Sequence, residues 1–519
     1  MPNKNKVKIV DLFAGPGGLG EGFSSFNGLN NRFSIGVSIE KDEYAHKTLL
    51  LRSFYRQFDH RKVPEEYYKF IKTDKFSDDG LKELLNNYPI QGQAARAETI
   101  CRELGKDDDD IFRAIDKAIG DDIKMKKPWV LIGGPPCQAY SLVGRARNKA
   151  DKSYSLDNDV RSKLYVEYLR VIARYQPAIF VMENVKGMLS AVVNGDRIIN
   201  QITSDLKAPS KAVINSKTFA GKRHKYKLYS LTIKHDPEAP FKPEDFIIKS
   251  EKYGIPQRRH RVIILGVRED YDPNTISLLK LQNKVSVNDV IRDLKPVYSS
   301  FSKRNVNLSN LDNSLAQHSS WKKLLCSFFS NDEIYDPDTR EQIGKFLPKL
   351  QKAKKSHLKP IHNEWYKNDN LSGYACNHEP RTHIRSDFLR YFFVCCYGKA
   401  HKASPRLDNF PKELLPAHKN IKTNKFIDRF KVQLENEPST TITSHISKDG
   451  HYYIHPDPSQ CRSLTVREAA RLQTFPDDYF FCSNKTQQYH QVGNAVPPLL
   501  AKQIAEIVWN ILIKSGKVK

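Results

Sequence analysis

Long apolar segments are scarce in this chain of 519 residues. No run approaches the 18 or more consecutive apolar residues that a membrane-spanning helix needs. The amino-terminal residues MPNKNKVKIVDLFAG also lack an apolar stretch of signal-peptide length. The sequence therefore predicts a protein that does not span a membrane and is not secreted.

Cysteine is also scarce, with 8 residues in the chain and no spacing typical of a disulfide framework. Metal-ligating side chains do gather at Cys376, His378, His383, Cys395 and Cys396. This group contains no C-x2-C pair, and adjacent cysteines are awkward tetrahedral ligands. We therefore expect no metal site and a reducing, cytoplasmic compartment.

Acidic residues are outnumbered, because 84 Lys and Arg face 59 Asp and Glu and leave a net charge of +25. Such an excess predicts a polyanionic partner, and nucleic acid is the first expectation. A basic membrane-surface protein is the alternative. Hydrophobic residues make up 39% of the chain, with aromatics spread throughout, which argues against wholesale disorder.

Strand and helix patterns alternate over the first 270 residues and predict an α/β domain with a parallel sheet. The expected strands are Val7–Leu12, Phe33–Ile39, Trp129–Ile132, Ala178–Met182, Tyr226–Ile233, Phe246–Lys249 and Arg261–Val267. An acid-rich helical insertion is expected at about 81–127, where the run 107–110 is typical of a solvated face or of a helix end. An amphipathic helix is expected at 162–175.

The alternation fades from residue 271, so we expect a catalytic domain at 1–270, a separate smaller domain at 271–434 and a returning segment at 435–519. In the returning segment Thr465 and Glu468 fit a capping box that opens a helix. Pro498 can occupy the first turn of a last apolar helix.

Four strand ends carry chemically useful residues. A glycine-rich turn follows the first strand, and Glu40 ends the second, which suits a nucleoside-bearing ligand. Cys137 follows the third strand and Glu183 the fourth, which places a thiol and a carboxyl at one sheet edge. The plainer alternatives are a tight turn, a buried structural cysteine and a solvated glutamate.

Six segments together give the chain a resemblance to the DNA cytosine-5 methyltransferase family, in the family's usual order. They are DLFAGPGG at 11–18, GGPPCQ at 133–138, ENV at 183–185, QRRHR at 257–261, LTVREAARLQTFP at 464–476 and QVGNAVPP at 491–498. The resemblance implies a doubly wound Rossmann-like methyltransferase domain with a smaller mixed target-recognition domain at 271–434. The acid-rich insertion is not explained by it.

Family chemistry gives these residues expected roles. By resemblance, the Cys137 thiolate adds to carbon 6 of cytosine, and Glu183 acts at ring nitrogen 3. Arg261 binds the cytosine carbonyl oxygen and Arg259 supports the site, while Asn184 holds the ring and the loop.

The implied methyl donor is S-adenosylmethionine. The residues expected to bind it are Phe13, Gly15, Pro16, Gly17, Gly18, Glu40, Asp74, Pro135, Asn494 and Val496. Among them Glu40 would hold the ribose and Asp74 the adenine amino group. Asn494 and Val496 would close the pocket, so the two ends of the chain should meet.

The implied substrate is double-stranded DNA, from which the target cytosine must be flipped out of the stack. Residues 139–159 resemble the family's catalytic loop, and the expected DNA contacts are Gln138, Ser141, Arg145 and Arg147. The alternative for the arginines is a solvated loop. We expect a monomeric prokaryotic modification enzyme, associated with the nucleoid, whose cognate restriction endonuclease acts separately.

Three alternatives remain open. Transfer RNA methyltransferases share the motif set but usually have a shorter recognition region. A DNA-binding regulator without catalysis is a second alternative, although Cys137, Glu183, Arg259 and Arg261 are all present. A NAD-dependent oxidoreductase is a third, and it lacks support because the G-x-G-x-x-G turn is missing.

Overall fold

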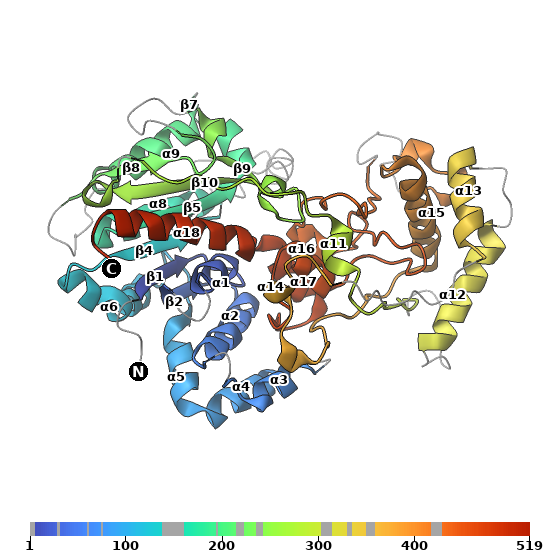
Figure 1. Cartoon of the computed structure of the whole chain (residues 1–519), viewed down its shortest axis with the longest axis horizontal. Coiled ribbons are helices and arrows are strands. Elements are labelled where there is room, and N and C mark those ends of the chain that lie inside the picture. The colour runs from blue at the N-terminus through green and yellow to red at the C-terminus, as the bar shows by residue number, and fades with distance from the viewer. Residues whose placement is uncertain are drawn as a thin grey trace.

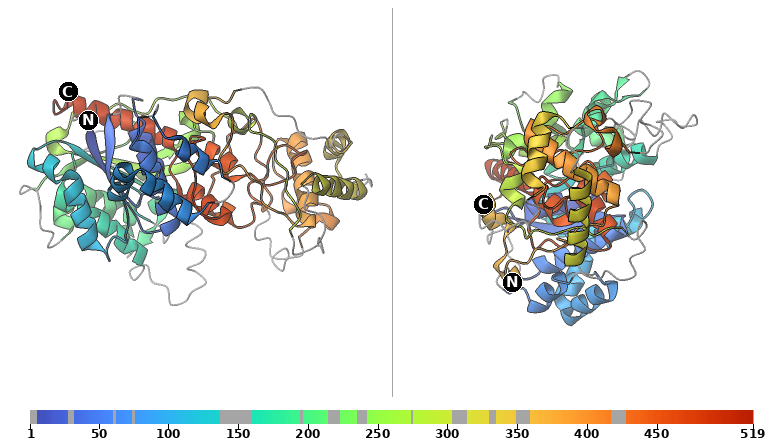
Figure 2. Two further views of the ribbon diagram at one scale, coloured as in Figure 1. Left: turned by 90° about the horizontal axis from the view of Figure 1, so that it is seen from below. Right: turned by 90° about the vertical axis from the view of Figure 1, so that its right-hand side faces the viewer.

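The computed structural model describes residues 6–27, 32–59, 62–73, 76–136, 160–193, 196–213, 223–234, 242–273, 275–302, 314–329, 335–348, 359–416 and 428–518. These residues form two lobes joined by a central region (Figure 1). One lobe carries a large sheet and both chain ends. The other is built around three helices, and the views at right angles show that the two lobes lie at opposite ends of an elongated molecule (Figure 2).

The large sheet has eight strands, in the order β3-β2-β1-β4-β5-β10-β8, with β9 beside β10. Their bounds are β1 Val7–Leu12, β2 Phe33–Glu40, β3 Thr99–Cys101, β4 Trp129–Gly133, β5 Ile179–Val185, β8 Tyr226–Tyr229, β9 Ile247–Lys249 and β10 His260–Arg268. The predicted strands are confirmed to within a few residues at their ends.

The expectation of a parallel sheet holds for the first five strands and is wrong for β10. Strands β3, β2, β1, β4 and β5 pair in parallel, whereas β10 runs antiparallel to β5, β8 and β9. Only residues 250–259 separate β9 from β10. A connection this short suits an antiparallel pair, because a parallel pair needs a crossover of a dozen or more residues.

Helices cover both faces of the sheet, as a doubly wound fold requires. Helices α1 (Gly18–Ser24) and α18 (Pro498–Lys514) pack on one face and enclose the first apolar core. Helices α6 (Asp108–Lys124), α8 (Val160–Tyr175) and α9 (Ile198–Lys207) pack on the other and enclose the second. The expectation of a doubly wound α/β fold is confirmed.

The two ends of the chain meet, as expected, where α1 packs against α18 (Figure 1). A Cβ atom at Gly22 would lie 2.4 Å from Cβ of Ala501, so glycine is needed for this close approach.

By length and composition alone the stretch Lys485–Lys514 could cross a membrane, and 67% of its most apolar window is buried inside the protein. It contains α17 (Lys485–Asn494) and the core helix α18, and burial in the core accounts for its apolar character.

The acid-rich insertion is mostly helical, and it also contains strand β3, which the sequence analysis did not predict. After α2 (Glu43–Arg56) come α3 (Glu65–Ile71), α4 (Asp78–Asn87) and α5 (Pro89–Glu98), then strand β3 and helix α6. The run Asp107–Asp110 opens α6, which confirms the expected helix end, since acids favour a helix amino terminus.

The central region contains α11 (Val287–Ile291), α14 (Asn363–Tyr366), α16 (Val466–Leu472) and α17 around a third core. The capping box at the start of α16 is confirmed. The Glu468 amide donates to Oγ1 of Thr465 at 3.1 Å, and the Thr465 amide donates to Oε2 of Glu468 at 2.7 Å.

The second lobe surrounds α12 (Ser314–Phe329), α13 (Pro337–Phe346) and α15 (Arg385–His401). Its core also takes in Val432, Ile454 and Cys461 from further along the chain. The expected domain boundaries at 271 and 434 remain predictions.

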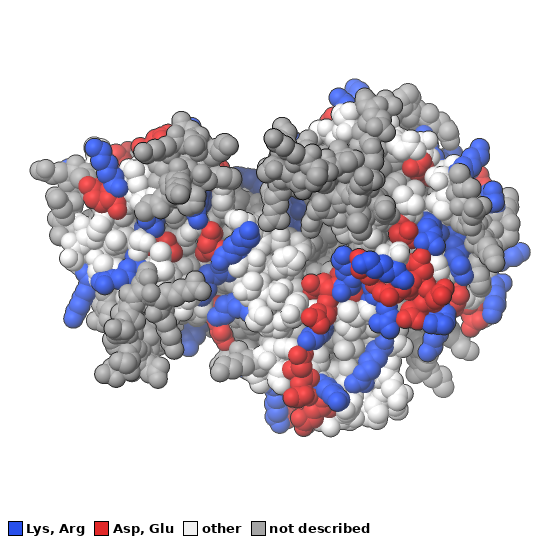
Figure 3. Space-filling model, turned by 180° about the vertical axis from the view of Figure 1, so that it is seen from behind, with Lys and Arg blue, Asp and Glu red and all other residues white. Residues whose placement is uncertain are grey.

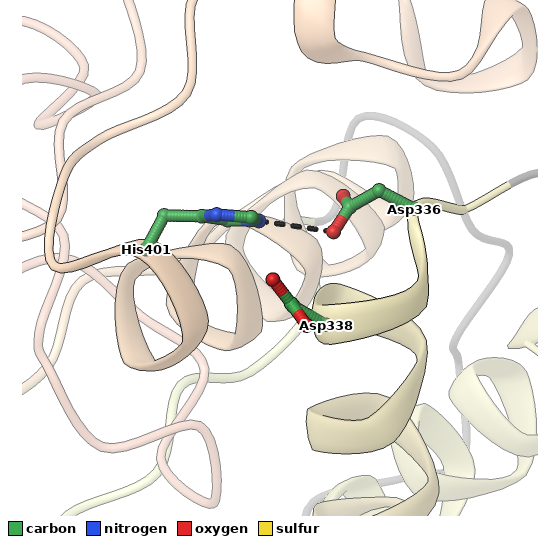
Figure 4. Close-up of side chains that lie close together, drawn as sticks. All are labelled: Asp336, Asp338 and His401. Atoms are coloured by element: carbon green, nitrogen blue, oxygen red, sulfur yellow. Dashed lines mark hydrogen bonds and ion pairs between the residues drawn. The ribbon is translucent and has the colours of Figure 1, made fainter.

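Possible metal ligands in this lobe are explained by ordinary contacts. Asp336 caps α13 through the Thr339 amide and pairs with Nε2 of His401 at 3.0 Å, with Asp338 nearby (Figure 4). These groups join α13 to α15 as a helix cap and a hydrogen bond. The cysteines suspected from the sequence lie apart, because Cys376 belongs to a different apolar core from Cys395 and Cys396.

Candidate functional site

The glycine-rich turn after β1 is tied to the end of β2. Phe13, Gly15 and Gly17 have positive φ values of 55°, 56° and 93°, which make the chain turn sharply. The Gly15 amide donates to Oε2 of Glu40 at 2.7 Å, and the Asp42 amide donates to Oε1 at 2.8 Å. Burial raises the pKa of Glu40, although these backbone hydrogen bonds oppose the rise.

The glycines of this turn have different surroundings. Among the residues that the structure describes, no atom lies within 4 Å of a Cβ built on Gly15, so they leave open space beside its backbone. A Cβ on Gly17 would lie 2.7 Å from the hydroxyl of Tyr479, and one on Gly18 would lie 2.2 Å from the carbonyl oxygen of Val496. Gly15 therefore offers a cradle that a ligand can fill, whereas Gly17 and Gly18 allow the turn to pack.

The remaining residues of the turn face the carboxyl-terminal segment. The carbonyl of Pro16 accepts a hydrogen bond from the Tyr479 hydroxyl at 2.5 Å. Val496 is buried against Gly18, and the exposed Asn494 lies two residues before it, at the end of α17. The turn and the carboxyl-terminal segment thus form one neighbourhood, as the sequence predicted.

The loop after β4 is held against the end of β5. Nδ2 of Asn184 donates to the carbonyl oxygen of Pro135 at 3.2 Å. Oε2 of Glu183 lies 2.8 Å from the position of a Cβ on Gly134. Pro136 is the last described residue of this loop, so Cys137, which follows it directly, lies outside the described residues. Gln138, Ser141, Arg145, Arg147 and, elsewhere, Asp74 lie outside them as well.

Glu183 and Arg261 form an ion pair across two neighbouring strands. Ile263 stands opposite Glu183 and Arg261 stands opposite Val185, so the pair is diagonal and its members share a face. Nε of Arg261 lies 2.9 Å from Oε1 of Glu183, and the side chains are only 14% and 13% exposed. Burial lowers the pKa of Arg261, and the Glu183 carboxylate opposes that change. A fixed carboxyl and guanidinium are thus placed at the edge of the sheet.

Arg259 has different surroundings from Arg261. It is 2% exposed, and its Nη1 donates to the carbonyl oxygens of Ile442 at 2.7 Å and Gly493 at 3.2 Å. Burial lowers the pKa of Arg259 well below its usual value, with the nearby Arg261 acting in the same direction. Arg259 therefore connects three segments of backbone.

A residue that the sequence analysis missed lies beside Glu40. Cys101 of β3 stands opposite Glu40 of β2, and the Arg102 amide donates to the Glu40 carbonyl at 3.1 Å. Glu103 follows at the same edge and pairs with Lys41 at 3.2 Å. No signal in the sequence revealed that Glu103 lies at this edge, because β3 has only three residues and lies between helices.

A cavity of about 680 Å³ lies away from these residues, between α2, α4 and α17. Ion pairs in its wall include Lys47 with Asp78 at 2.7 Å and Lys485 with Glu379 at 3.1 Å. Acidic and basic side chains also mingle on the sheet-bearing lobe in the view from behind (Figure 3). The net positive charge of the chain is therefore not gathered on that part of the surface.

Comparison with known proteins agrees with this geometry. The sequence profile of the family described as C-5 cytosine-specific DNA methylase matches residues 101–210 and 215–509. Type II methyltransferase M.Bpa9945I of Bacillus paralicheniformis is 30% identical over 518 residues, which cover 97% of this chain and 99% of that protein. DNA (cytosine-5-)-methyltransferase M.ApeKI of Aeropyrum pernix is 24% identical over 418 residues, which cover 74% and 81%.

Among solved structures, a putative DNA modification methyltransferase encoded within an E. coli prophage matches with a TM-score of 0.52 and 18% identity. The match covers 98% of this chain and 100% of that one. At this identity the likeness shows the fold, which is the Rossmann-like α/β fold of methyltransferases.

Proposed function

The chain belongs to the family of C-5 cytosine-specific DNA methylases, and from that membership we propose how its residues divide the work of methylating DNA. Its activity is that of a DNA (cytosine-5)-methyltransferase, and its relatives include type II methyltransferases. The family implies a reaction that depends on S-adenosylmethionine and a DNA substrate. The observation that carries the proposed site is the Glu183–Arg261 pair beside the loop that leads to Cys137.

The cytosine site lies at the ends of β4, β5 and β10. The Cys137 thiolate would add to carbon 6 of a flipped-out cytosine, which makes carbon 5 nucleophilic. Glu183 would hold a proton at ring nitrogen 3, and Arg261 would donate to the carbonyl oxygen, so both groups stabilise the ring while charge develops. Asn184 keeps the loop in place through the Pro135 carbonyl.

The cofactor site lies at the ends of β1, β2 and β3. S-adenosylmethionine, when bound, supplies a methyl group on a sulfonium. After transfer of that group to carbon 5, water would remove the carbon 5 proton, and elimination would return the Cys137 thiolate. Gly15 lines the adenosine pocket, and Glu40 accepts hydrogen bonds from the ribose hydroxyls. We propose Glu103 rather than Asp74 for the contact with the adenine amino group, because Cys101 of β3 stands opposite Glu40 and Glu103 follows two residues later.

The other predicted residues surround these two sites. Phe13 and Pro16 shape the turn, and Asn494 and Val496 close it from the carboxyl-terminal side. Gln138, Ser141, Arg145 and Arg147 contact the duplex after the base has flipped. We further propose that the protein acts as a monomer at the nucleoid in the cytoplasm, as the modification enzyme paired with a separate restriction endonuclease.

Methylation sequencing tests this function. Plasmid DNA would be recovered from a host without cytosine methylation that expresses the wild type or Cys137→Ala. We expect 5-methylcytosine at one short motif with the wild type and none with the variant, although both bind S-adenosylhomocysteine in solution. Marks that persist in the variant would exclude Cys137 as the nucleophile. A soluble, cofactor-binding wild type that marks transfer RNA and not DNA would show that RNA is the substrate.

A further inference from the structure

Buried glutamine side chains connect the second lobe to the cofactor side of the sheet-bearing lobe. Gln257, Gln433 and Gln473 are 0%, 1% and 0% exposed. They come from three distant parts of the sequence, yet their side-chain hydrogen bonds form one series, in which the backbone of residues 440–442 joins Gln433 to Gln257. A buried amide is stable only when its donors and acceptors find partners, so each link constrains the next.

The series begins in the second lobe, at Gln433. The backbone amide of Gln433 donates to the carbonyl oxygen of Ile454 at 2.9 Å, and Ile454 belongs to the core of that lobe. The Gln433 side chain donates to the Tyr452 carbonyl at 2.7 Å and accepts from the Thr440 amide at 2.9 Å. Gln433 thus ties the segment 439–444 to the second lobe.

The series continues through Gln257, just before β10. The amide of Ile442 donates to Oε1 of Gln257 at 2.7 Å. Nε2 of Gln257 donates to Oε1 of Gln473 at 2.8 Å and to the Leu472 carbonyl at 3.1 Å. The backbone next to Gln257 also pairs with Ser439, so the segment 439–444 is held at two points.

The series ends at the segment that closes the cofactor site. Nε2 of Gln473 donates to the carbonyl oxygens of Val492 at 2.7 Å and Ala495 at 3.1 Å. These two residues bracket Asn494, and Val496, the next residue after Ala495, contacts Gly18 of the glycine-rich turn. The segment 439–444 therefore cannot shift without straining the bonds that position residues 492–496.

We propose that Gln257 and Gln473 are positioning residues that couple DNA engagement by the second lobe to closure of the cofactor site. The inference rests on the proposed function and adds a regulation of the same site. Coupling of this kind is reciprocal, so DNA tightens cofactor binding by the factor by which the cofactor tightens DNA binding. Both glutamines are 0% exposed, so the role assigned to them acts through the backbone groups that they bond.

The test measures the dissociation constant of S-adenosylhomocysteine by titration calorimetry, with and without a saturating duplex that carries the methylated motif. Full-length wild type, Gln257→Met and Gln473→Met are compared, because methionine keeps the volume and removes the amide. In the wild type we expect the duplex to tighten cofactor binding by about fivefold or more. In both variants we expect this ratio to fall close to one.

A matched control comes from Gln491, another buried glutamine, on α17. It is 2% exposed, and its side chain donates to the carbonyls of Tyr44 and Cys482 and accepts from the hydroxyl of Thr48. None of these three partners belongs to the series through Gln257 and Gln473. Gln491→Met loses as many bonds as Gln473→Met and leaves the series intact. We expect the duplex to tighten cofactor binding in Gln491→Met as much as in the wild type, even if the thermal unfolding midpoint of Gln491→Met falls as far as that of Gln473→Met.

The outcomes separate the inference from the function on which it rests. A wild-type ratio near one, a wild-type ratio retained in folded Gln473→Met, or an equal loss in Gln491→Met would each overturn the coupling. If Gln257→Met does not fold, Gln257→Glu replaces it, because Oε1 can still accept from Ile442 while both donor bonds are lost. A wild type that binds no S-adenosylhomocysteine would overturn the proposed function, and the inference with it.

Discussion

Asp11, on β1 beneath the glycine-rich turn, gives a quantitative prediction about stability and pH. The residue is 0% exposed, and neither carboxyl oxygen has a hydrogen-bond partner among the residues that the structure describes. Burial raises its pKa from 3.8 to about 8; Arg56 opposes the rise and Glu40 adds to it. Between these two pKa values the folded protein keeps a proton that the unfolded chain releases.

The sign and size of the effect follow from proton linkage. When the folded state binds more protons than the unfolded state, the free energy of unfolding falls as the pH rises. The slope for one such group is about 1.36 kcal/mol per pH unit. From pH 5 to pH 7, Asp11 therefore lowers the free energy of unfolding by about 2.7 kcal/mol, most of which Asp11→Asn should abolish because asparagine does not titrate.

Urea titration of the wild type and Asp11→Asn at pH 5, 6 and 7, followed by tryptophan fluorescence, measures this difference. The free energy of unfolding of the variant can differ from that of the wild type by an amount that does not depend on pH. The test is therefore how this difference changes between pH 5 and pH 7. Asp121→Asn is the control, since that side chain is 85% exposed on the same lobe. A difference between wild type and Asp11→Asn that stays constant from pH 5 to pH 7 would refute the reasoning.

Three further predictions concern packing, helix propensity and catalysis. Gly22→Ala should destabilise the protein by about 1–3 kcal/mol, because its Cβ would lie 2.4 Å from that of Ala501. At Gly120, inside α6, no atom of the described residues lies within 4 Å of a built Cβ, so Gly120→Ala should stabilise the protein by about 0.5–1 kcal/mol. The thermal unfolding midpoints of both variants test these two predictions. Glu183→Gln should slow single-turnover methyl transfer by about 10²–10⁴-fold, because it removes the proton-holding carboxyl that pairs with Arg261. A variant that keeps more than a tenth of the wild-type rate would contradict that role.

Local patterns in the sequence predicted most of the elements that position the site. The apolar run Val7–Leu12 forms β1, and Thr465 caps α16 as its spacing indicated. Both depend on neighbours within a few residues, which is the range over which periodicity and capping act. Strand β3 escaped prediction because three residues carry no periodic signal, so Glu103 could be proposed only once the structure showed that strand.

The sequence by itself determined the kind of protein this is, because six short motifs in order carry the chemistry of cytosine methylation. It also determined that the two chain ends meet. Only the tertiary structure decided which distant side chains share an environment. The pairing of Glu183 with Arg261 depends on the antiparallel register of β10, and the bond between Gln257 and Gln473 joins residues 216 positions apart. Register and long-range contacts follow from the packing of whole helices and strands, which no local pattern records.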